Sequence, residues 1–217
     1  MTESPLFDLT LDPLSFDAVF RERANPLAGT DEAGRGPLAG PVVAAAVILD
    51  PNLDYPGLGD SKKLSAAARD KAFDLIAAHA VSWAWAAVEA SEVDRLNPLR
   101  AALFAMTRAV AGLSPAPALV LVDGNQAPAL TVPVKTVVKG DSRSLSISAA
   151  SIMAKVTRDR IMLEWHERYP QYGFDRHKGY GTAEHLEALR RHGPSPCHRL
   201  TFRGVKPEEP KPETDGR

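Results

Sequence analysis

Hydrophobic positions along the chain follow two different periods, which together predict alternating strands and helices. A continuous apolar run at 41–49 predicts a buried strand, and shorter runs predict strands at 27–30, 81–89, 118–122 and 132–138. Apolar residues at helical spacing predict helices from a Ser65 N-cap to 79, at 98–113, at 144–168, and from a Thr182 N-cap to Gly193. Strands that form a hairpin-like group and are then separated by helices indicate a mixed sheet covered by helices. The predicted fold class is α/β.

The chain shows no internal repeat and no linker rich in Pro, Gly or Ser, so we expect one compact domain at 25–206. Its 217 residues, 44% of them hydrophobic, suffice for a buried core. Residues 1–24 are expected to be a short lead-in with one amphipathic stretch near 16–23. Residues 207–217 are rich in Pro and charge and contain no apolar residue, which predicts a disordered tail.

Charge is distributed unevenly, although the formal net charge is only −1. Residues 1–60 hold ten acidic and three basic residues, whereas 155–206 hold eleven basic and six acidic residues with five histidines among them. This pattern is compatible with one face that contacts phosphates and another that holds metal; a solvated helix face is the alternative on charge alone.

Cysteine content and hydropathy indicate the compartment. The lone Cys197 excludes an intrachain disulfide and a Cys-based zinc cluster. The longest apolar run is too short to cross a bilayer, and the first residues lack the features of a signal peptide. We therefore expect a cytoplasmic protein with no membrane partner.

The first chemical candidate is the adjacent pair Asp31 and Glu32, which follows a short strand and enters a glycine-rich turn at 34–40. Neighbouring side chains of a strand point to opposite faces, so both carboxylates can serve one metal centre only if the chain bends or bulges here. The glycines of the turn make such a bend plausible. An acidic pair in a solvated turn is the alternative.

The turn itself satisfies the dinucleotide-binding pattern G-x-G-x-x-A from Gly34 to Ala39, but the run that follows is strand-like and the required helix is missing. We therefore reject a nucleotide-binding fold. The glycines instead allow the backbone to approach a sugar-phosphate chain closely, with Arg35 placed to contact a phosphate.

Two further carboxylates lie at element ends: Asp123 after the strand expected to be central, and Asp141 at the entry to the longest helix. Taken singly, the first is equally well explained as a turn residue and the second as an N-cap. Together with the first pair they form four carboxylates that one sheet edge could collect. Such hard oxygen ligands suit Mg²⁺ or Mn²⁺ and two-metal phosphodiester hydrolysis. No Ser-His-Asp arrangement is legible, and for His177 a phosphate contact or a surface position is expected.

Six blocks in order give the chain a family signature, and by them it resembles ribonuclease HII, the type 2 ribonuclease H. The blocks are DEAGRGPLAGPVVAAAVIL at 31–49, DSKKLS at 60–65, VDG at 122–124, KGDSRSLSISAASIMAKVTRD at 139–159, YPQYGFDRHKGYGT at 169–182 and GPSPCHRLTF at 193–202.

The resemblance implies a ribonuclease H-like fold, with a mixed five-stranded sheet flanked by helices and a C-terminal helical extension. It also implies cleavage of RNA in RNA–DNA hybrids, and of DNA duplexes 5′ of a lone ribonucleotide, with two Mn²⁺ or Mg²⁺ ions and with 3′-hydroxyl and 5′-phosphate products. The implied roles are removal of ribonucleotides from DNA and removal of RNA primers, by a chain that we expect to be a monomer.

The resemblance also assigns site residues. The metal-holding carboxylates are Asp31, Glu32, Asp123 and Asp141; the loop that senses the ribose 2′-hydroxyl is Gly34, Arg35 and Gly36; Tyr180 stacks at the RNA-to-DNA junction; Lys62 and Lys63 contact phosphates.

Three alternatives stay open beside this hypothesis. A non-catalytic module could keep the fold and bind hybrids, although all four acidic positions argue against it. Another ribonuclease H-like nuclease, such as a junction resolvase, would not require a 2′-hydroxyl. Ribonuclease HIII shares the chemistry but carries a substrate-binding domain before the catalytic one, where this chain has only about 28 residues, and the Gly34-Arg35-Gly36 loop also favours ribonuclease HII.

Overall fold

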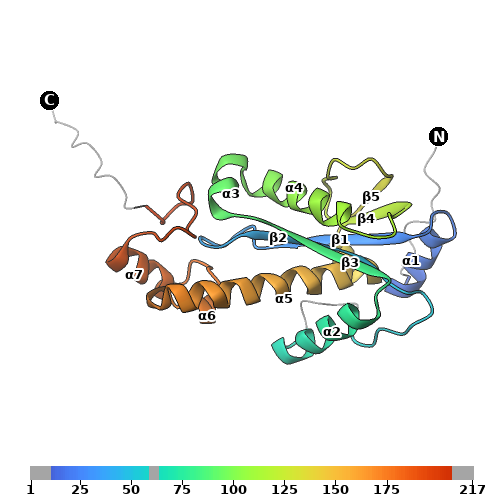
Figure 1. Ribbon diagram of the computed structural model, residues 1–217, viewed down its shortest axis with the longest axis horizontal. Coiled ribbons are helices and arrows are strands. Elements are labelled where there is room, and N and C mark those ends of the chain that lie inside the picture. Colours follow the sequence, from blue (N-terminus) through green and yellow to red (C-terminus); the bar gives the residue numbers. More distant parts are fainter. Residues whose placement is uncertain (1–10, 59–63, 207–217) are drawn as a thin grey trace.

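The computed structural model describes residues 11–58 and 64–206. A single sheet of five strands runs through the molecule, with helices on both of its faces (Figure 1). The strands are β1 (Leu27–Ala33), β2 (Val42–Ile48), β3 (Ser82–Val88), β4 (Leu119–Asp123) and β5 (Val134–Val137).

Strand order in the sheet is β3-β2-β1-β4-β5. The first three strands along the chain form an antiparallel meander, and β4 and β5 then join β1 in parallel. The mixed five-stranded sheet predicted from the sequence is confirmed.

Seven α-helices are described: α1 (Pro13–Arg21), α2 (Ala66–His79), α3 (Ala90–Leu96), α4 (Pro98–Ala111), α5 (Leu145–Arg168), α6 (Phe174–His177) and α7 (Ala183–His192). Two single-turn 3₁₀ helices, η2 (Gly140–Ser142) and η3 (Pro170–Tyr172), flank α5. In Figure 1, α4 lies on one side of the sheet, and α5 and α2 lie on the other.

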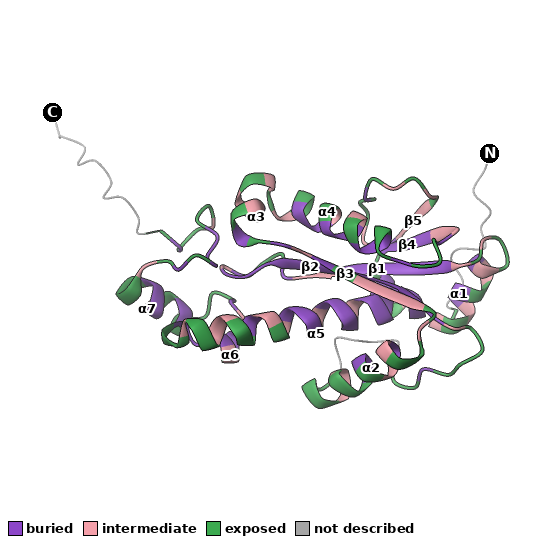
Figure 2. Cartoon of the chain, viewed as in Figure 1, coloured by how far each residue is buried: buried purple, intermediate pink, exposed green. Residues whose placement is uncertain are grey.

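Strand β2 explains why helices cover both faces, since all seven of its residues are buried (Figure 2). Ala44 and Ala46 pack toward α4, while Ala45 and Val47 pack toward α5 and α2. Such continuous apolar strands are typical of sheets covered on both faces. The four neighbouring small or β-branched residues let both helices approach closely.

Helix starts and strand limits agree closely with the sequence pattern. Ser65 and Thr182 cap α2 and α7 through their side-chain oxygens, as predicted. Strand β1 differs, because it continues to Ala33 and so includes the acidic pair. The short helices α3 and α6 were not predicted, since four to seven residues are too few to establish a helical period.

The amphipathic stretch near the N-terminus forms α1, which Asp12 caps by accepting from the backbone N–H groups of Leu14 and Ser15. Phe16 and Phe20 are buried on this helix and share a core cluster with residues of β1, β4, β5 and α5. The helix therefore closes one end of the sheet.

Beyond α5, the chain builds a smaller C-terminal helical part around Tyr172 and Phe174, whose rings stack at 5.4 Å between centroids. A separate apolar cluster joins them to Leu189 of α7 and to Val205. Among the described helices, none combines the length and apolar character needed to cross a membrane.

Candidate active site

Sheet topology brings two acidic residues to one edge of the sheet. The parallel β1–β4 ladder ends at the pair Thr30–Val122, and Asp31 and Asp123 are the next residue of each strand. The backbone N–H of Gly140 donates to Asp123 Oδ1 at 2.6 Å. This bond fixes the η2 turn, which carries Asp141, against the end of β4.

Asp31 and Glu32 do not occupy a bend, contrary to the sequence-based expectation. Strand β1 pairs regularly with β2 through both residues, opposite Ala45 and Ala44. The pair therefore obeys strand alternation: Asp31 faces α5, where it forms a hydrogen bond with Ser151. Glu32 lies on the α4 side.

Although Asp31 and Glu32 lie on opposite faces, the charge of Asp123 reaches both. Burial raises the pKa of Asp31 well above its ordinary value, and repulsion from Glu32 and Asp123 adds to the effect. Burial also raises the pKa of Glu32, opposed by a hydrogen bond from Arg35 and increased by repulsion from Asp123. The edge of the sheet thus gathers negative charge with little compensation.

Gly29 explains how α5 reaches this edge. A Cβ atom at Gly29 would lie 2.2 Å from the backbone carbonyl carbon of Ser146, so no other residue allows the helix to pass so close to β1. This approach places Ser151 beside Asp31 and sets the beginning of α5 next to the η2 turn. Asp141 is itself buried there.

The donor set suits a hard divalent cation. Carboxylate oxygens are the ligands that Mg²⁺ and Mn²⁺ prefer, and clustered carboxylates of raised pKa are those that a cation would relieve. Over residues 11–58 and 64–206, no three His, Cys, Asp or Glu side chains are already gathered as a metal-binding group. The carboxylates therefore fit such ions by their chemistry, and Asp123 is the one whose charge acts on both Asp31 and Glu32.

We call the sheet edge that carries Asp31, Glu32 and Asp123, with the Asp141 turn beside it, the acidic edge. A groove of about 460 Å³ adjoins it. It is lined by Glu32, Ala33, Gly34, Arg35, Gly36, Arg69, Ser151, Lys155, Arg158 and Tyr180. The structure thus brings the predicted loop and Tyr180 together. A Cβ atom at Gly36 would lie 3.9 Å from the ring of Tyr180, which is 48% exposed.

Arg35 contributes to the groove in a way the sequence did not predict. Its guanidinium forms an ion pair with Glu32 at 3.2 Å, with half of the side chain exposed. The side chain that was expected to contact a phosphate is therefore directed, in this structure, at an acidic neighbour.

Two buried arginines, Arg158 and Arg199, hold the glycine-rich loop through its backbone carbonyls. The sequence analysis assigned no role to either of them. Arg199 donates to the carbonyl oxygens of Gly34, Arg35 and Gly40 at 2.6–3.1 Å. Arg158 donates to three further carbonyls, those of Ala39, Pro41 and Lys178. Burial lowers the pKa of Arg199 to about 9. Their only sequence signal was the basic C-terminal third, which does not separate buried arginines from exposed ones.

Histidines of the basic segment are likewise not all on the surface. His177, expected to be a phosphate contact or a surface residue, is buried, and its Nε2 donates to the Tyr172 carbonyl at 2.8 Å. His185 donates from Nδ1 to the Tyr180 carbonyl at 2.9 Å and contacts His198, whose pKa burial lowers to about 4. These neutral rings support the backbone at Tyr180.

Lys62 and Lys63, the predicted phosphate contacts, lie outside the described residues. Other cations line the groove in the part that is described, namely Arg69 and Lys155.

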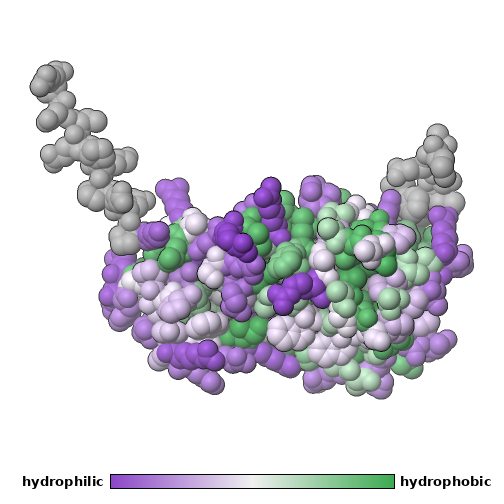
Figure 3. Space-filling view, turned by 45° about the horizontal axis from the view of Figure 1, so that its top comes forward, coloured by the Kyte–Doolittle hydropathy of each residue, from purple (hydrophilic) through white to green (hydrophobic). Residues whose placement is uncertain are grey.

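On the face of the molecule seen in Figure 3, hydrophobic residues form separate groups between hydrophilic ones.

Comparison with known proteins identifies the family of this chain. The profile of the family described as ribonuclease HII matches residues 28–205. "Ribonuclease HII 1" of Methylibium petroleiphilum is 59% identical over 82% of this chain and 90% of its own length. "Ribonuclease HII" of Delftia acidovorans is 61% identical over 82% of this chain and 76% of its own length.

Solved structures show the same fold. Ribonuclease H2 from Pyrococcus horikoshii aligns with a TM-score of 0.71 at 27% identity, over 82% of this chain and 94% of that one. A ribonuclease HIII, titled Bst-RNase HIII in complex with Mn²⁺, aligns with a TM-score of 0.63 at 22% identity, over 82% and 67% of the two chains. Because the family profile covers most of the chain and the relatives are 59% and 61% identical to it, this chain belongs to the ribonuclease HII family and is a ribonuclease H.

Proposed function

We propose that this enzyme cuts the RNA strand of RNA–DNA hybrids and also cuts DNA duplexes on the 5′ side of a single embedded ribonucleotide. The observation that carries the proposal is that one sheet edge collects Asp31, Glu32 and Asp123 with the Asp141 turn, next to a groove lined by the glycine loop and Tyr180. The carboxylates that would hold metal and the groove that would receive the substrate therefore adjoin each other.

Asp31, Glu32, Asp123 and Asp141 would hold two Mg²⁺ or Mn²⁺ ions. When bound, such ions supply an activated water and stabilise the leaving oxygen of an in-line displacement. Asp31 and Glu32 face opposite sides of the regular strand β1, and the charge of Asp123 acts on both, so Asp123 is the carboxylate that would link the two. The products would carry a 3′-hydroxyl and a 5′-phosphate.

Selection of a ribonucleotide falls to the loop at 34–36 and to Tyr180. Arg199 fixes the loop through its carbonyl oxygens, which leaves backbone groups of a rigid loop available to read a ribose 2′-hydroxyl. Tyr180, half exposed beside Gly36, offers a ring on which a sugar or base at the junction can stack. Lys155 and Arg69 are placed to contact phosphates along the groove.

Such an activity suits the removal of ribonucleotides from DNA and of RNA primers, which are the cellular roles we propose. The experiment is cleavage of a labelled DNA duplex with one ribonucleotide, beside an all-DNA duplex, with Mg²⁺, Mn²⁺ or EDTA. Metal-dependent cutting only at the 5′ side of the ribonucleotide is the expected result. Binding without cutting would instead favour a non-catalytic module, and cutting of the all-DNA duplex would favour a nuclease that ignores the 2′-hydroxyl.

A further inference from the structure

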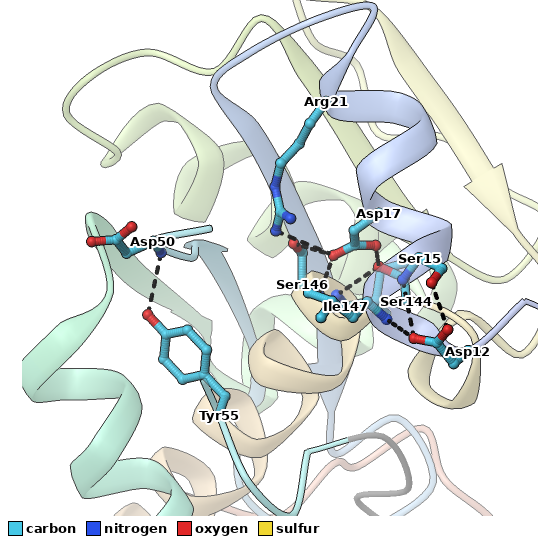
Figure 4. A network of polar contacts seen from close by, with 10 residues as sticks. Asp12, Ser15, Asp17, Arg21, Asp50, Tyr55, Ser144, Ser146 and Ile147 are labelled. Carbon is cyan, nitrogen blue, oxygen red and sulfur yellow. Dashed lines mark hydrogen bonds and ion pairs between the residues drawn. The ribbon is translucent and has the colours of Figure 1, made fainter. Parts of the chain in front are cut away.

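A buried carboxylate outside the acidic edge joins α1 to the beginning of α5 (Figure 4). Asp17 of α1 has no exposed surface. Its Oδ1 accepts from the Ser144 hydroxyl at 2.6 Å, and its Oδ2 accepts from the backbone N–H and the hydroxyl of Ser146 at 2.8 and 2.6 Å. Arg21, one turn later on α1, lies 3.7 Å from the same Oδ2.

Position explains why a carboxylate is tolerated there. The first N–H groups of a helix have no partner within it and carry partial positive charge, so a buried acceptor at this end satisfies them. Burial raises the pKa of Asp17, while the bonds from Ser144 and Ser146 oppose that effect. Asp17 therefore acts as a second cap of α5, supplied from a different helix.

The network continues from this cap to the acidic edge. Ser144 is the N-cap of α5 and accepts from the Ile147 N–H at 3.2 Å. Its own backbone N–H donates to the Gly140 carbonyl at 2.8 Å, and the Gly140 N–H donates to Asp123 Oδ1 at 2.6 Å. A continuous path of hydrogen bonds thus leads from Asp17 through the η2 turn to a metal-site carboxylate.

A second contact ties α1 to the same segment. The Arg143 guanidinium lies over the ring of Phe16, 5.3 Å from its centroid. Asp141 lies between Gly140 and this pair of attachments, within η2. The turn that carries Asp141 is therefore held at one side by Asp123 and at the other by α1.

We infer that Asp17 is a positioning residue for the metal site, which sets the η2 turn so that Asp141 and Asp123 present their carboxylates together. Helix α1 lies ahead of the segment at 28–205 that matches the family profile, so this support is supplied by a part of the chain outside it. The inference rests on the proposed two-metal function. Groups that orient the residues holding a metal typically change its affinity 10- to 100-fold when they are removed.

The test compares Asp17→Ala and Asp17→Asn with Asp12→Ala. Asp12 caps the N-terminus of α1 at an exposed site, so its loss loosens the same helix without removing a bond to Ser144 or Ser146. Mn²⁺ affinity is measured by the electron paramagnetic resonance of free Mn²⁺, and cleavage is measured against Mn²⁺ concentration, both well below the unfolding temperature of every variant.

Asp17→Ala is expected to weaken Mn²⁺ binding, and to raise the half-activating concentration, by about tenfold. Asp17→Asn, which keeps one acceptor oxygen, should show a smaller change, and Asp12→Ala should show none. Unchanged Mn²⁺ binding in Asp17→Ala, or an equal change in Asp12→Ala, would overturn the inference. If Asp17→Ala does not fold, Ser144→Ala cuts the same path and must weaken Mn²⁺ binding for the inference to stand.

Wild-type protein separates this inference from the function on which it rests. A wild-type chain that binds no Mn²⁺ and cleaves nothing would refute the proposed function and, with it, the role of Asp17. Normal wild-type binding and cleavage, beside an Asp17→Ala variant that matches them, would refute the positioning role alone.

Discussion

The acidic edge and the glycine-rich loop at 34–40 both contain or contact buried charges, but the charges differ in how well their neighbours compensate them. Arg199 and Arg158 are buried, but their guanidinium groups donate to backbone carbonyls at every nitrogen. Asp31 is buried as well, yet its charged neighbours include two further carboxylates that repel it. Every guanidinium nitrogen of the two arginines thus has an acceptor, whereas the carboxylates of the acidic edge repel one another and have one opposing charge described beside them, that of Arg35 on Glu32.

This difference separates a structural role from a functional one. A buried charge is stable only when hydrogen bonds or opposite charges compensate it. The arginines meet this condition and shape the loop, so they need nothing further. The carboxylates meet it only in part, which is the state expected of a site that becomes complete with divalent cations.

Removal of one carboxylate from the acidic edge should have the largest effect. Asp123→Asn is expected to lower the cleavage rate by roughly 10³-fold, or about 4 kcal/mol in activation free energy, because it loses a metal-site charge next to both Asp31 and Glu32. Asp74→Asn, on the exposed face of α2, is the control and should cleave normally. Normal turnover by Asp123→Asn would disprove the metal role of this edge.

Removal of a buried arginine should instead affect stability first. Arg199→Ala leaves the carbonyls of Gly34, Arg35 and Gly40 without their donor and opens a cavity, so we expect a loss of about 3 kcal/mol in the free energy of unfolding. Urea denaturation measures it. Arg190→Ala removes an exposed residue paired with Glu187 and should leave the free energy of unfolding nearly unchanged. Equal losses in the two variants would contradict the structural role of Arg199.

Tyr180 lies where the two regions meet and should show a smaller effect on activity. Tyr180→Ala is expected to lower cleavage at a single ribonucleotide by about tenfold, within the range of one lost stacking contact. Tyr180→Phe keeps the ring and should retain cleavage within about twofold. The kcat/KM values of the two variants show whether the ring or the hydroxyl of Tyr180 contributes to cleavage. An equally large loss in Tyr180→Phe would show that the hydroxyl matters more than the ring.

The sequence predicted the elements well because their signals are local. The apolar run of β2, the caps Ser65 and Thr182, and the long helical period of α5 all depend on neighbouring residues. Asp123 and Asp141 were likewise predicted as candidates from their places at element ends, and the structure places them at the end of β4 and in η2. The bend expected at Asp31 was wrong, because β1 stays regular and presents its two carboxylates on opposite faces.

What the sequence could not show depends on contacts between distant segments. Arg199 bonds to carbonyls about 160 positions earlier in the chain, and Asp17 bonds to Ser146, 129 positions later. In the sequence, an arginine in a basic segment or an aspartate in an amphipathic helix gives the same pattern whether its side chain is exposed or buried. Such partners become evident only when the fold brings them together.

Thermal stability of Asp31→Asn with and without metal is the most direct test of the partly compensated charge at the acidic edge. Burial, with repulsion from Glu32 and Asp123, raises the folded-state pKa of Asp31 above its ordinary value of 3.8. The ionised carboxylate therefore costs stability at neutral pH, and this cost grows as the pH rises from 3.8 toward the raised value. Without metal, Asp31→Asn should unfold about 2–4 °C above the wild type, or about 1 kcal/mol for a chain of this size.

Saturating Mn²⁺ should reverse that order, because only the intact set of carboxylates binds the ion well and binding to the folded state raises the unfolding temperature. We predict that Asp31→Asn is the more stable protein in EDTA and that the wild type is the more stable protein in Mn²⁺. The same order of stability under both conditions would contradict the claim that this sheet edge holds its charge for a divalent cation.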